Sequence, residues 1–318
     1  IEPLGVLALD IDYRRRGSLL HDAMVRFHAA CGEDGDPLGV EEGERRFAEQ
    51  YAAAVSAAAD SIGTAPHERA LLRVEAMQAA AWAPMYRDQL EAYGHGSDRL
   101  DEPMRPTYFE ARFGPRRSSD ATDETLSTDE PFRLRIGDEE LLLTGRIDRI
   151  DVGSVDGRAV FNVVDYKTAA NVRPSLEAVR DGRQLQIYLY ALAAEQLLLR
   201  EQQAAAWRFG YWAVRDKGFK PVKEGRREVV AHEIDSSGAL QATPAWRALS
   251  ADVAERLRAI VGGIRAGQFP VVGATEDDAE GRDYPGVARA SQARALGKVL
   301  DPPTTPPAGV DERQEAPA

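Results

Sequence analysis

The amino-acid sequence predicts a single α/β or α+β domain that begins with a helical part. Two observations carry this prediction. Apolar residues recur at helical spacing over about the first hundred residues, and from Pro106 onward β-branched runs alternate with turns before helices return. A chain of 318 residues can bury a sizeable core, and its 43% hydrophobic and 29% charged residues are typical of a globular protein.

The helical part consists of three predicted helices. Apolar residues recur every three or four positions over residues 17–31 and again over residues 44–61. The third helix is predicted over residues 66–93, with Gly94 just past its end, where helices favour glycine. Pro84 is expected to kink this third helix, because proline cannot donate a backbone hydrogen bond.

The period of the sequence then changes from helix to strand. Residues 106–113 and 132–136 are predicted strands. Residues 140–151 and 158–167 alternate or run apolar with many β-branched side chains. Because a glycine-containing turn at residues 153–157 separates them, these two stretches predict a β-hairpin.

The rest of the chain alternates once more between helix and strand. Gly182 is expected to open a long helix that reaches about residue 203. Further strands are predicted at residues 206–214 and 227–234, followed by an amphipathic helix at residues 244–266. The Pro- and acid-rich end, residues 300–318, predicts a disordered tail, so a single domain is expected over residues 1–299.

Composition excludes several classes of protein. No apolar run approaches the roughly 20 residues that a membrane-spanning helix needs, and no secretory signal is visible, so we expect a cytoplasmic protein without a membrane partner. The one cysteine, Cys31, excludes an internal disulfide and a self-contained four-cysteine metal site. The formal charge of -12 argues against simple electrostatic binding of nucleic acid. Because the chain begins with Ile1, we expect a domain cut from a longer protein.

Three charged residues of the predicted hairpin indicate metal-assisted chemistry. Asp148 lies on one strand, and Asp165 and Lys167 lie two residues apart on the other, on one face of the sheet. Burial of Asp165 and Lys167 at the end of an apolar strand is unfavourable unless something compensates their charges, and a divalent cation held between Asp148 and Asp165 would do so. Two carboxylates and an ammonium group suit phosphodiester hydrolysis. The competing interpretation is an exposed ion pair, which contributes less than about 1 kcal/mol.

Several short motifs occur in a fixed order along the chain. They are Arg16-Gly-Ser-Leu-Leu-His21, Pro106-Thr-Tyr-Phe-Glu-Ala-Arg-Phe-Gly114, Gly145-Arg-Ile-Asp-Arg-Ile-Asp151, Val163-Val-Asp-Tyr-Lys-Thr168 and Gln184-Leu-Gln-Ile-Tyr-Leu-Tyr190. Together they resemble the PD-(D/E)xK nuclease superfamily, in particular the RecB-like nuclease domain of AddB-type helicase–nuclease subunits. The resemblance covers residues 16–270 and implies a restriction-endonuclease-like core, a central mixed β-sheet flanked by helices. The helical part at residues 1–105 would carry the His motif, and residues 106–270 would form the catalytic core.

The same resemblance implies a metal site and a catalytic lysine. The implied ligands are His21, Asp148, Asp165 and the backbone carbonyl of Tyr166, and Lys167 is the implied catalytic lysine. Oxygen-rich ligation with one imidazole suits Mg²⁺ or Mn²⁺ better than zinc.

A Gln-x-x-x-Tyr pair is the last implied part of the site. Gln186 and Tyr190 lie four residues apart on one helical face, and the resemblance gives them the role of supporting the lysine and the DNA path. Gln184 and Tyr188 have the same spacing and stay open as the alternative. Many AddB-type domains carry four cysteines for an iron–sulfur cluster. The matching region here, residues 269–292, contains no cysteine, so no cluster is expected.

The implied function is that of a Mg²⁺-dependent DNA nuclease, an exonuclease in type, in double-strand break repair and recombination. A helicase-like domain upstream, or a helicase–nuclease partner subunit, is expected beside it. Two alternatives stay open. The chain could be a DNA-end-binding module with little or no nuclease activity, or a metal-dependent hydrolase of RNA or a nucleotide.

Two further features have two interpretations each. Glu110, on the strand before the hairpin, either contributes to the site or faces solvent. Residues 208–228 combine basic residues with aromatic ones, a pattern that can hold a nucleic-acid strand. An ordinary β-hairpin with solvated charges explains that stretch equally well.

Overall fold

The computed structural model of the protein describes residues 13–31, 43–62, 66–95, 100–116, 126–137, 139–169 and 172–267. The chain divides within helix α7 (Pro244–Arg265) into two compact units, Ile1–Val253 and Ala254–Ala318. The predicted tail at residues 300–318 and the predicted domain limit at residue 299 lie outside the described residues. All residues of the candidate site described below lie in the first unit.

Four helices form the N-terminal part: α1 (Tyr13–Ala30), α2 (Gly43–Ile62), α3 (Pro66–Ala80) and α4 (Ala83–His95). The helices predicted at residues 17–31 and 44–61 are confirmed. The helix predicted at residues 66–93, with a kink at Pro84, is two helices, because the chain interrupts it at Ala81 and Trp82. Pro84 explains the break, since proline is tolerated in the first turn of a helix but not in its interior. No helix of the described chain is long and apolar enough to cross a membrane.

A mixed five-stranded sheet follows, in the order β1-β4-β5-β6-β7. Its strands are β1 (Glu102–Phe113), β4 (Gly145–Val155), β5 (Arg158–Lys167), β6 (Ala205–Ala213) and β7 (Gly218–Pro221). Only β5 and β6 run parallel; the other neighbours are antiparallel. The hairpin predicted from the sequence is confirmed as β4 and β5. The strand predicted to begin at residue 140 is interrupted at Thr144, and its first half is β3 (Glu139–Leu143), which pairs with β2 (Phe132–Ile136) in a separate ribbon.

The parallel connection from β5 to β6 runs through a helical segment. It contains α5 (Leu176–Arg180), α6 (Leu185–Ala193) and a π-helical turn η1 (Ala194–Leu198), where the sequence predicts one helix at residues 182–203. Past β7, the chain forms short strands, namely β8 (Lys223–Glu224), β9 (Arg227–Glu228), β10 (His232–Ile234) and β11 (Leu240–Ala242). The strand predicted at residues 227–234 is therefore broken, because the N–H groups of Val229 and Ala231 bond to Val222 and Trp207 instead of to one neighbouring strand.

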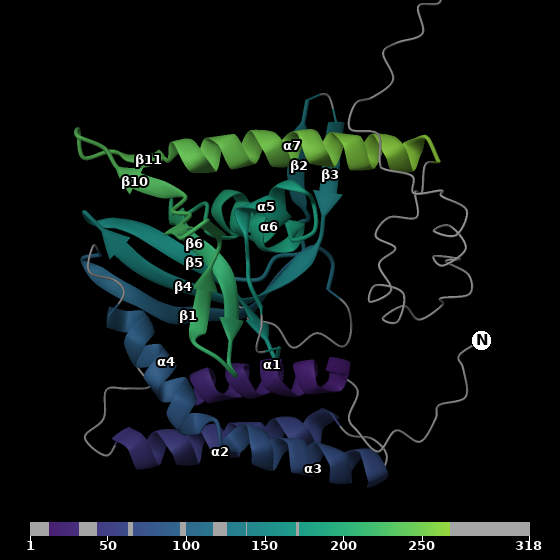
Figure 1. Cartoon of the computed structure of the whole chain (residues 1–318), viewed down its shortest axis with the longest axis vertical. Helices are drawn as coiled ribbons and strands as arrows, with labels where there is room; N and C mark the ends of the chain where they lie inside the picture. The colour runs from purple at the N-terminus through teal and green to yellow at the C-terminus, as the bar shows by residue number, and fades with distance from the viewer. Residues whose placement is uncertain are drawn as a thin grey trace, which may run out of the picture. The chain divides into compact units, whose positions relative to one another are not determined.

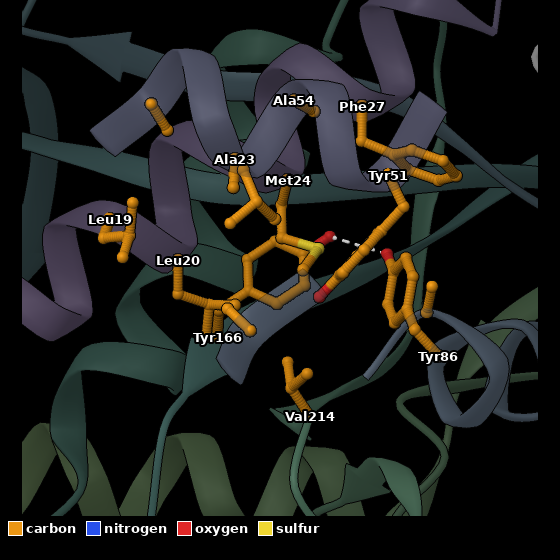
Figure 2. Packing of buried hydrophobic residues seen from close by; sticks show 14 of the residues in the cluster. Leu19, Leu20, Ala23, Met24, Phe27, Tyr51, Ala54, Tyr86, Tyr166 and Val214 are labelled. Carbon is orange, nitrogen blue, oxygen red and sulfur yellow. Dashed lines mark hydrogen bonds between the residues drawn. The ribbon is translucent and has the colours of Figure 1, made fainter. Parts of the chain in front are cut away.

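The core that positions the site lies between the sheet and the N-terminal helices. Helices α1–α4 lie on one side of the sheet, and α5 and α6 lie on the other (Figure 1). Buried apolar side chains of α1, α2 and α4 pack around Tyr166 of β5 (Figure 2), and Trp212 of β6 belongs to the same cluster. Each large side chain buried in this way contributes roughly 1.5–3 kcal/mol. Since side chains alternate along a strand, Asp165 and Lys167 face away from the side of β5 that carries Tyr166.

One histidine inside this core is held in its neutral form. His28 of α1 is buried, its Nε2 lies 2.7 Å from the hydroxyl of Tyr86, and its ring stacks on Phe109 with 4.8 Å between centroids. Burial and the positive charge of Arg149 hold the pKa of His28 well below its usual value of 6.5. Protonation of His28 is therefore coupled to unfolding.

We expect the protein to lose stability as the pH falls below 6.5, because the unfolded chain binds a proton at His28 that the folded chain excludes. This one group contributes a limiting slope of about 1.4 kcal/mol per pH unit. In His28→Gln, which keeps a hydrogen-bonding group for Tyr86 but does not titrate, that share of the slope should vanish. Urea unfolding of both proteins between about pH 5 and pH 7 measures the difference. Parallel stability curves would contradict a neutral His28 in the folded protein.

Candidate metal centre

Two aspartates come together where β4 begins and β5 ends. The antiparallel pairing joins Arg149 to Val164, so Asp148 and Asp165 are the next residues of their strands at the same edge of the sheet. Their side chains are buried, with exposed fractions of 7% and 4%. The main-chain N–H of Tyr166 donates a hydrogen bond to Oδ2 of Asp148 over 2.9 Å. The predicted hairpin thus places both predicted carboxylates in one buried site.

Helix α1 brings a histidine to this edge from a distant part of the chain. Nδ1 of His21 lies 3.3 Å from Oδ1 of Asp148. Its other ring nitrogen, Nε2, lies 3.3 Å from the main-chain carbonyl oxygen of Tyr166. His21 therefore contacts two other predicted ligands, Asp148 and the Tyr166 carbonyl.

Glu110 of β1 is a further acidic group in the site. The register between β1 and β4 places it opposite Asp148. Its Oε1 lies 3.9 Å from Nδ1 of His21. Its Oε2 forms an ion pair with Nε of Arg146, with 2.6 Å between the two atoms. Glu110 is 7% exposed, which rules out the interpretation that it faces solvent.

The backbone at Glu110 is unusual for a strand. Its φ angle is 52°, in the left-handed region that side chains other than glycine rarely adopt. Such a conformation costs on the order of 1–3 kcal/mol and persists where the surrounding structure imposes it. Oε1 of Glu110 is also buried and has no hydrogen-bond partner among the described residues. Both features lower the stability of the folded chain, so they indicate a functional role for the Glu110 carboxylate.

Asp165 and Lys167 form the second half of the cluster. Nζ of Lys167 lies 2.5 Å from Oδ2 of Asp165 and 5.0 Å from the centre of the Tyr211 ring on β6. The ligand atoms of His21, Glu110 and Asp148 all lie within 4.8 Å of one another, and Asp165 is not part of this group. Its carboxylate is instead paired with the lysine. The part played by Tyr211 could not be read from the sequence, because it depends on the register between β5 and β6.

Burial and mutual repulsion shift the ionisation of these groups. Burial lowers the pKa of His21, but the hydrogen bond to Asp148 and the charges of the three carboxylates outweigh it and raise that pKa to about 9. Burial and the charge of Asp148 raise the pKa of Glu110 to about 7 and the pKa of Asp165 to about 6, against the opposing charges of Arg146 and Lys167. The site therefore disfavours the charged forms of Glu110 and Asp165, with burial as the larger cause.

Helix α6 presents the predicted glutamine and tyrosine. Nε2 of Gln186 donates to the hydroxyl of Tyr190 over 2.9 Å, and the charges of Asp148 and Asp165 act on Tyr190 from nearby. The alternative pair has other partners. Gln184 accepts a hydrogen bond from the N–H of Ser175, and the hydroxyl of Tyr188 donates to Ser250. This geometry favours Gln186 and Tyr190 over Gln184 and Tyr188.

A cavity of about 640 Å³ adjoins the cluster on the side of α1. His21, Glu110 and Arg146 lie on its wall, together with Asp22 and Arg26 of the Asp22–Arg26 ion pair. The cavity therefore connects the buried acids with a lining that contains both positive and negative side chains.

The basic and aromatic stretch at residues 208–228 is part of the framework. Phe209 and Trp212 are fully buried in the core. Arg208 and Lys223 pair with Glu228 at 3.3 and 3.8 Å. These contacts favour the ordinary β-hairpin over a surface that holds a nucleic-acid strand.

A sequence profile of the PD-(D/E)XK nuclease superfamily matches residues 5–276. A subunit of the ATP-dependent helicase/deoxyribonuclease of Moorella thermoacetica is 30% identical over 216 residues, which cover 65% of this chain and 17% of that protein. Subunits of the same name from Carboxydothermus hydrogenoformans and Clostridium perfringens (strain SM101) are 34% and 32% identical over 91 and 100 residues. These matches cover 28% and 31% of this chain and 8% of each relative. The chain thus spans 8% to 17% of the length of these relatives.

Ionised Glu110 should destabilise the metal-free protein. Its pKa of about 7 in the folded state exceeds the usual 4.5, so the stability present at low pH is lost as the pH rises through about 7. With a chelator at about pH 8, we expect Glu110→Gln to be about 1–2 kcal/mol more stable than the wild type by urea unfolding. The control Glu140→Gln removes a carboxylate that pairs with Arg133 at the surface, and it should bring no gain. A Glu110→Gln protein that is no more stable than the wild type would refute the repulsion described here.

Proposed function

The chain belongs to the PD-(D/E)XK nuclease superfamily, and from this premise we propose that it is a metal-dependent DNA nuclease. Its mixed five-stranded sheet, with helices on both faces and a helical part before it, is the restriction-endonuclease-like fold predicted from the sequence. The single observation that carries the proposal is the buried contact between His21 of α1 and Asp148 of the hairpin, beside the pair of Asp165 and Lys167.

The donor set supports a Mg²⁺ or Mn²⁺ site. Ligand atoms of His21, Glu110 and Asp148 lie within 4.8 Å of one another, and the buried Oε1 of Glu110 has no hydrogen-bond partner among the described residues. Carboxylate and carbonyl oxygens with one imidazole suit these cations. We propose His21, Asp148, Asp165 and the carbonyl of Tyr166 as the ligands, Asp165 through the oxygen that Lys167 does not hold, with Glu110 as a further acidic group beside them.

The charged residues of β5 have a defined part in this chemistry. A bound divalent cation supplies Lewis-acid polarisation of the phosphodiester and makes a nearby water more acidic. Lys167 is held by Asp165 over 2.5 Å and lies over the ring of Tyr211. From there its ammonium group orients the attacking water or stabilises charge that develops on the phosphate. Gln186 and Tyr190 support the lysine and the DNA path from α6.

The cavity beside α1 offers a place for the DNA strand next to the cleaved phosphate. Arg26 and Arg146 lie on its wall and can contact phosphate oxygens, which position a strand without reading its sequence. Arg146 is 44% exposed at its side chain, although it pairs with Glu110. On substrate binding, Arg146 would release Glu110 and bind a phosphate oxygen instead.

The names of the relatives support a wider setting. Each relative is named as a subunit of an ATP-dependent helicase/deoxyribonuclease. We propose that this chain acts as an exonuclease in the repair of double-strand breaks, in the cytoplasm, beside a helicase-like domain or partner subunit. DNA is the proposed substrate.

Lys167→Ala should lower DNA cleavage by about 100-fold or more, because it removes the group that stabilises the developing charge. The measurement is cleavage of linear double-stranded and single-stranded DNA by the full chain with Mg²⁺, with Mn²⁺ and with a chelator. Lys223→Ala is the matched control. It removes a lysine of β8 that is 44% exposed at its side chain and pairs with Glu228, and it should cleave like the wild type.

Equal cleavage by Lys167→Ala and the wild type would contradict the proposal, as would the absence of cleavage by either protein with both metals. DNA binding without cleavage would instead indicate a DNA-end-binding module. Faster digestion of RNA than of DNA in parallel reactions would indicate the other substrate.

A further inference from the structure

A fully buried ion pair lies in the core, on the face of β4 that helices α1–α4 cover. Arg149 and Asp151 are both 0% exposed, and Nε and Nη2 of Arg149 donate to Oδ1 and Oδ2 of Asp151 over 2.5 and 2.7 Å. The guanidinium group also lies 4.5 Å from the centre of the Trp212 ring. Buried pairs of this kind are seldom stabilising relative to apolar residues of the same size, because both charges lose their hydration. Another role is therefore to be sought for the pair.

The third guanidinium nitrogen reaches two tyrosines. Nη1 of Arg149 donates to the hydroxyl of Tyr166 over 3.2 Å and to that of Tyr86 over 3.4 Å. The two hydroxyls lie 3.4 Å apart, and Figure 2 shows them pointing toward each other inside the apolar cluster. Since Asp151 fixes the plane of the guanidinium, the position of both hydroxyls is fixed as well.

Each of the two tyrosines is connected by hydrogen bonds to an element that carries a proposed metal ligand. The backbone of Tyr166 contacts that site directly, because its N–H donates to Asp148 and its carbonyl oxygen lies 3.3 Å from Nε2 of His21. Tyr86 contacts Nε2 of His28, which lies on α1 two turns beyond His21. The network around Arg149 therefore holds the strand that carries the carbonyl and the helix that carries the histidine.

We propose that Arg149 is a positioning residue for the metal centre and acts through Tyr166 and, by way of Tyr86 and His28, through α1. This inference rests on the proposed metal site and extends it. Ligand groups must be held within about 0.5 Å of the productive geometry, and outer hydrogen bonds supply that constraint. Apolar packing alone permits small sliding of α1 over β5, and the hydrogen bonds from Arg149 to Tyr166 and Tyr86, with the contact between Tyr86 and His28, oppose it.

Two variants of the full chain test this role. Tyr166→Phe removes only the hydroxyl and leaves the ring in the core. The double variant Arg149→Met/Asp151→Leu removes both charges together, so that no unpaired charge remains buried. Calorimetric titration with Mn²⁺ measures metal affinity, and thermal unfolding with a chelator measures stability without metal. The matched control is Tyr188→Phe, which removes another buried tyrosine hydroxyl, the one that donates to Ser250.

We expect Tyr166→Phe and the double variant to bind Mn²⁺ roughly 10-fold more weakly than the wild type. Tyr188→Phe should keep the wild-type affinity, and the three variants should unfold within a few degrees of the wild type. Wild-type Mn²⁺ affinity in a folded Tyr166→Phe protein and a folded double variant would overturn the inference. If the double variant does not fold, Tyr166→Phe decides alone.

The failure of this inference is distinguishable from failure of the proposed function. A wild type that binds Mn²⁺ and cleaves DNA, beside variants of equal affinity, removes the role of Arg149 and leaves the nuclease proposal standing. A wild type that neither binds Mn²⁺ nor cleaves DNA removes both.

Discussion

Repulsion among three buried carboxylates is the constraint on which the site depends. Glu110, Asp148 and Asp165 come from three strands and are each at most 7% exposed. Acids so close together raise one another's pKa unless positive charge compensates them. In the folded chain that charge comes from three cationic side chains on α1, β4 and β5, namely His21, Arg146 and Lys167. The helical part is therefore more than a cover for the sheet, because without α1 the acids lose one of their partners.

The two strands of the hairpin bury charge on both faces, with opposite outcomes. Alternation directs Asp148 to one face of β4 and Arg149 to the other. On the face that α1–α4 cover, Arg149 and Asp151 neutralise each other. Arg149 donates hydrogen bonds to Asp151 and to a tyrosine hydroxyl. On the other face three acids meet three cations, but burial still raises the pKa values of Glu110 and Asp165, and one oxygen of Glu110 lacks a hydrogen-bond partner within the described chain. The first cluster, with its charges paired and bonded, fixes the geometry of the strands. The second, with an unbonded carboxylate oxygen, is suited to binding a cation. The main chain of Tyr166 connects the two.

Local signals in the sequence predict the parts of this arrangement that are local in space. The hairpin follows from alternation and a glycine turn, and the pair of Asp165 and Lys167 follows from two-residue spacing on a strand. Contacts between distant segments are different. That Glu110 faces Asp148 depends on the register of β1 against β4, and no local pattern encodes such a register. For the same reason the sequence alone leaves Glu110 open, whereas His21 is predicted only through the resemblance that the order of the motifs carries.

The distribution of charge limits how this chain can hold DNA. A net charge of -12 provides no long-range attraction to a phosphate backbone. The stretch at residues 208–228 does not supply it locally, because Phe209 and Trp212 are core residues and Arg208 pairs with an acid. The basic side chains proposed for phosphate contact are Lys167 of β5 and, on the cavity wall, Arg26 and Arg146. So few contacts give weak binding with a shallow salt dependence. Weak DNA binding by this chain alone would agree with the proposed setting beside a helicase-like neighbour.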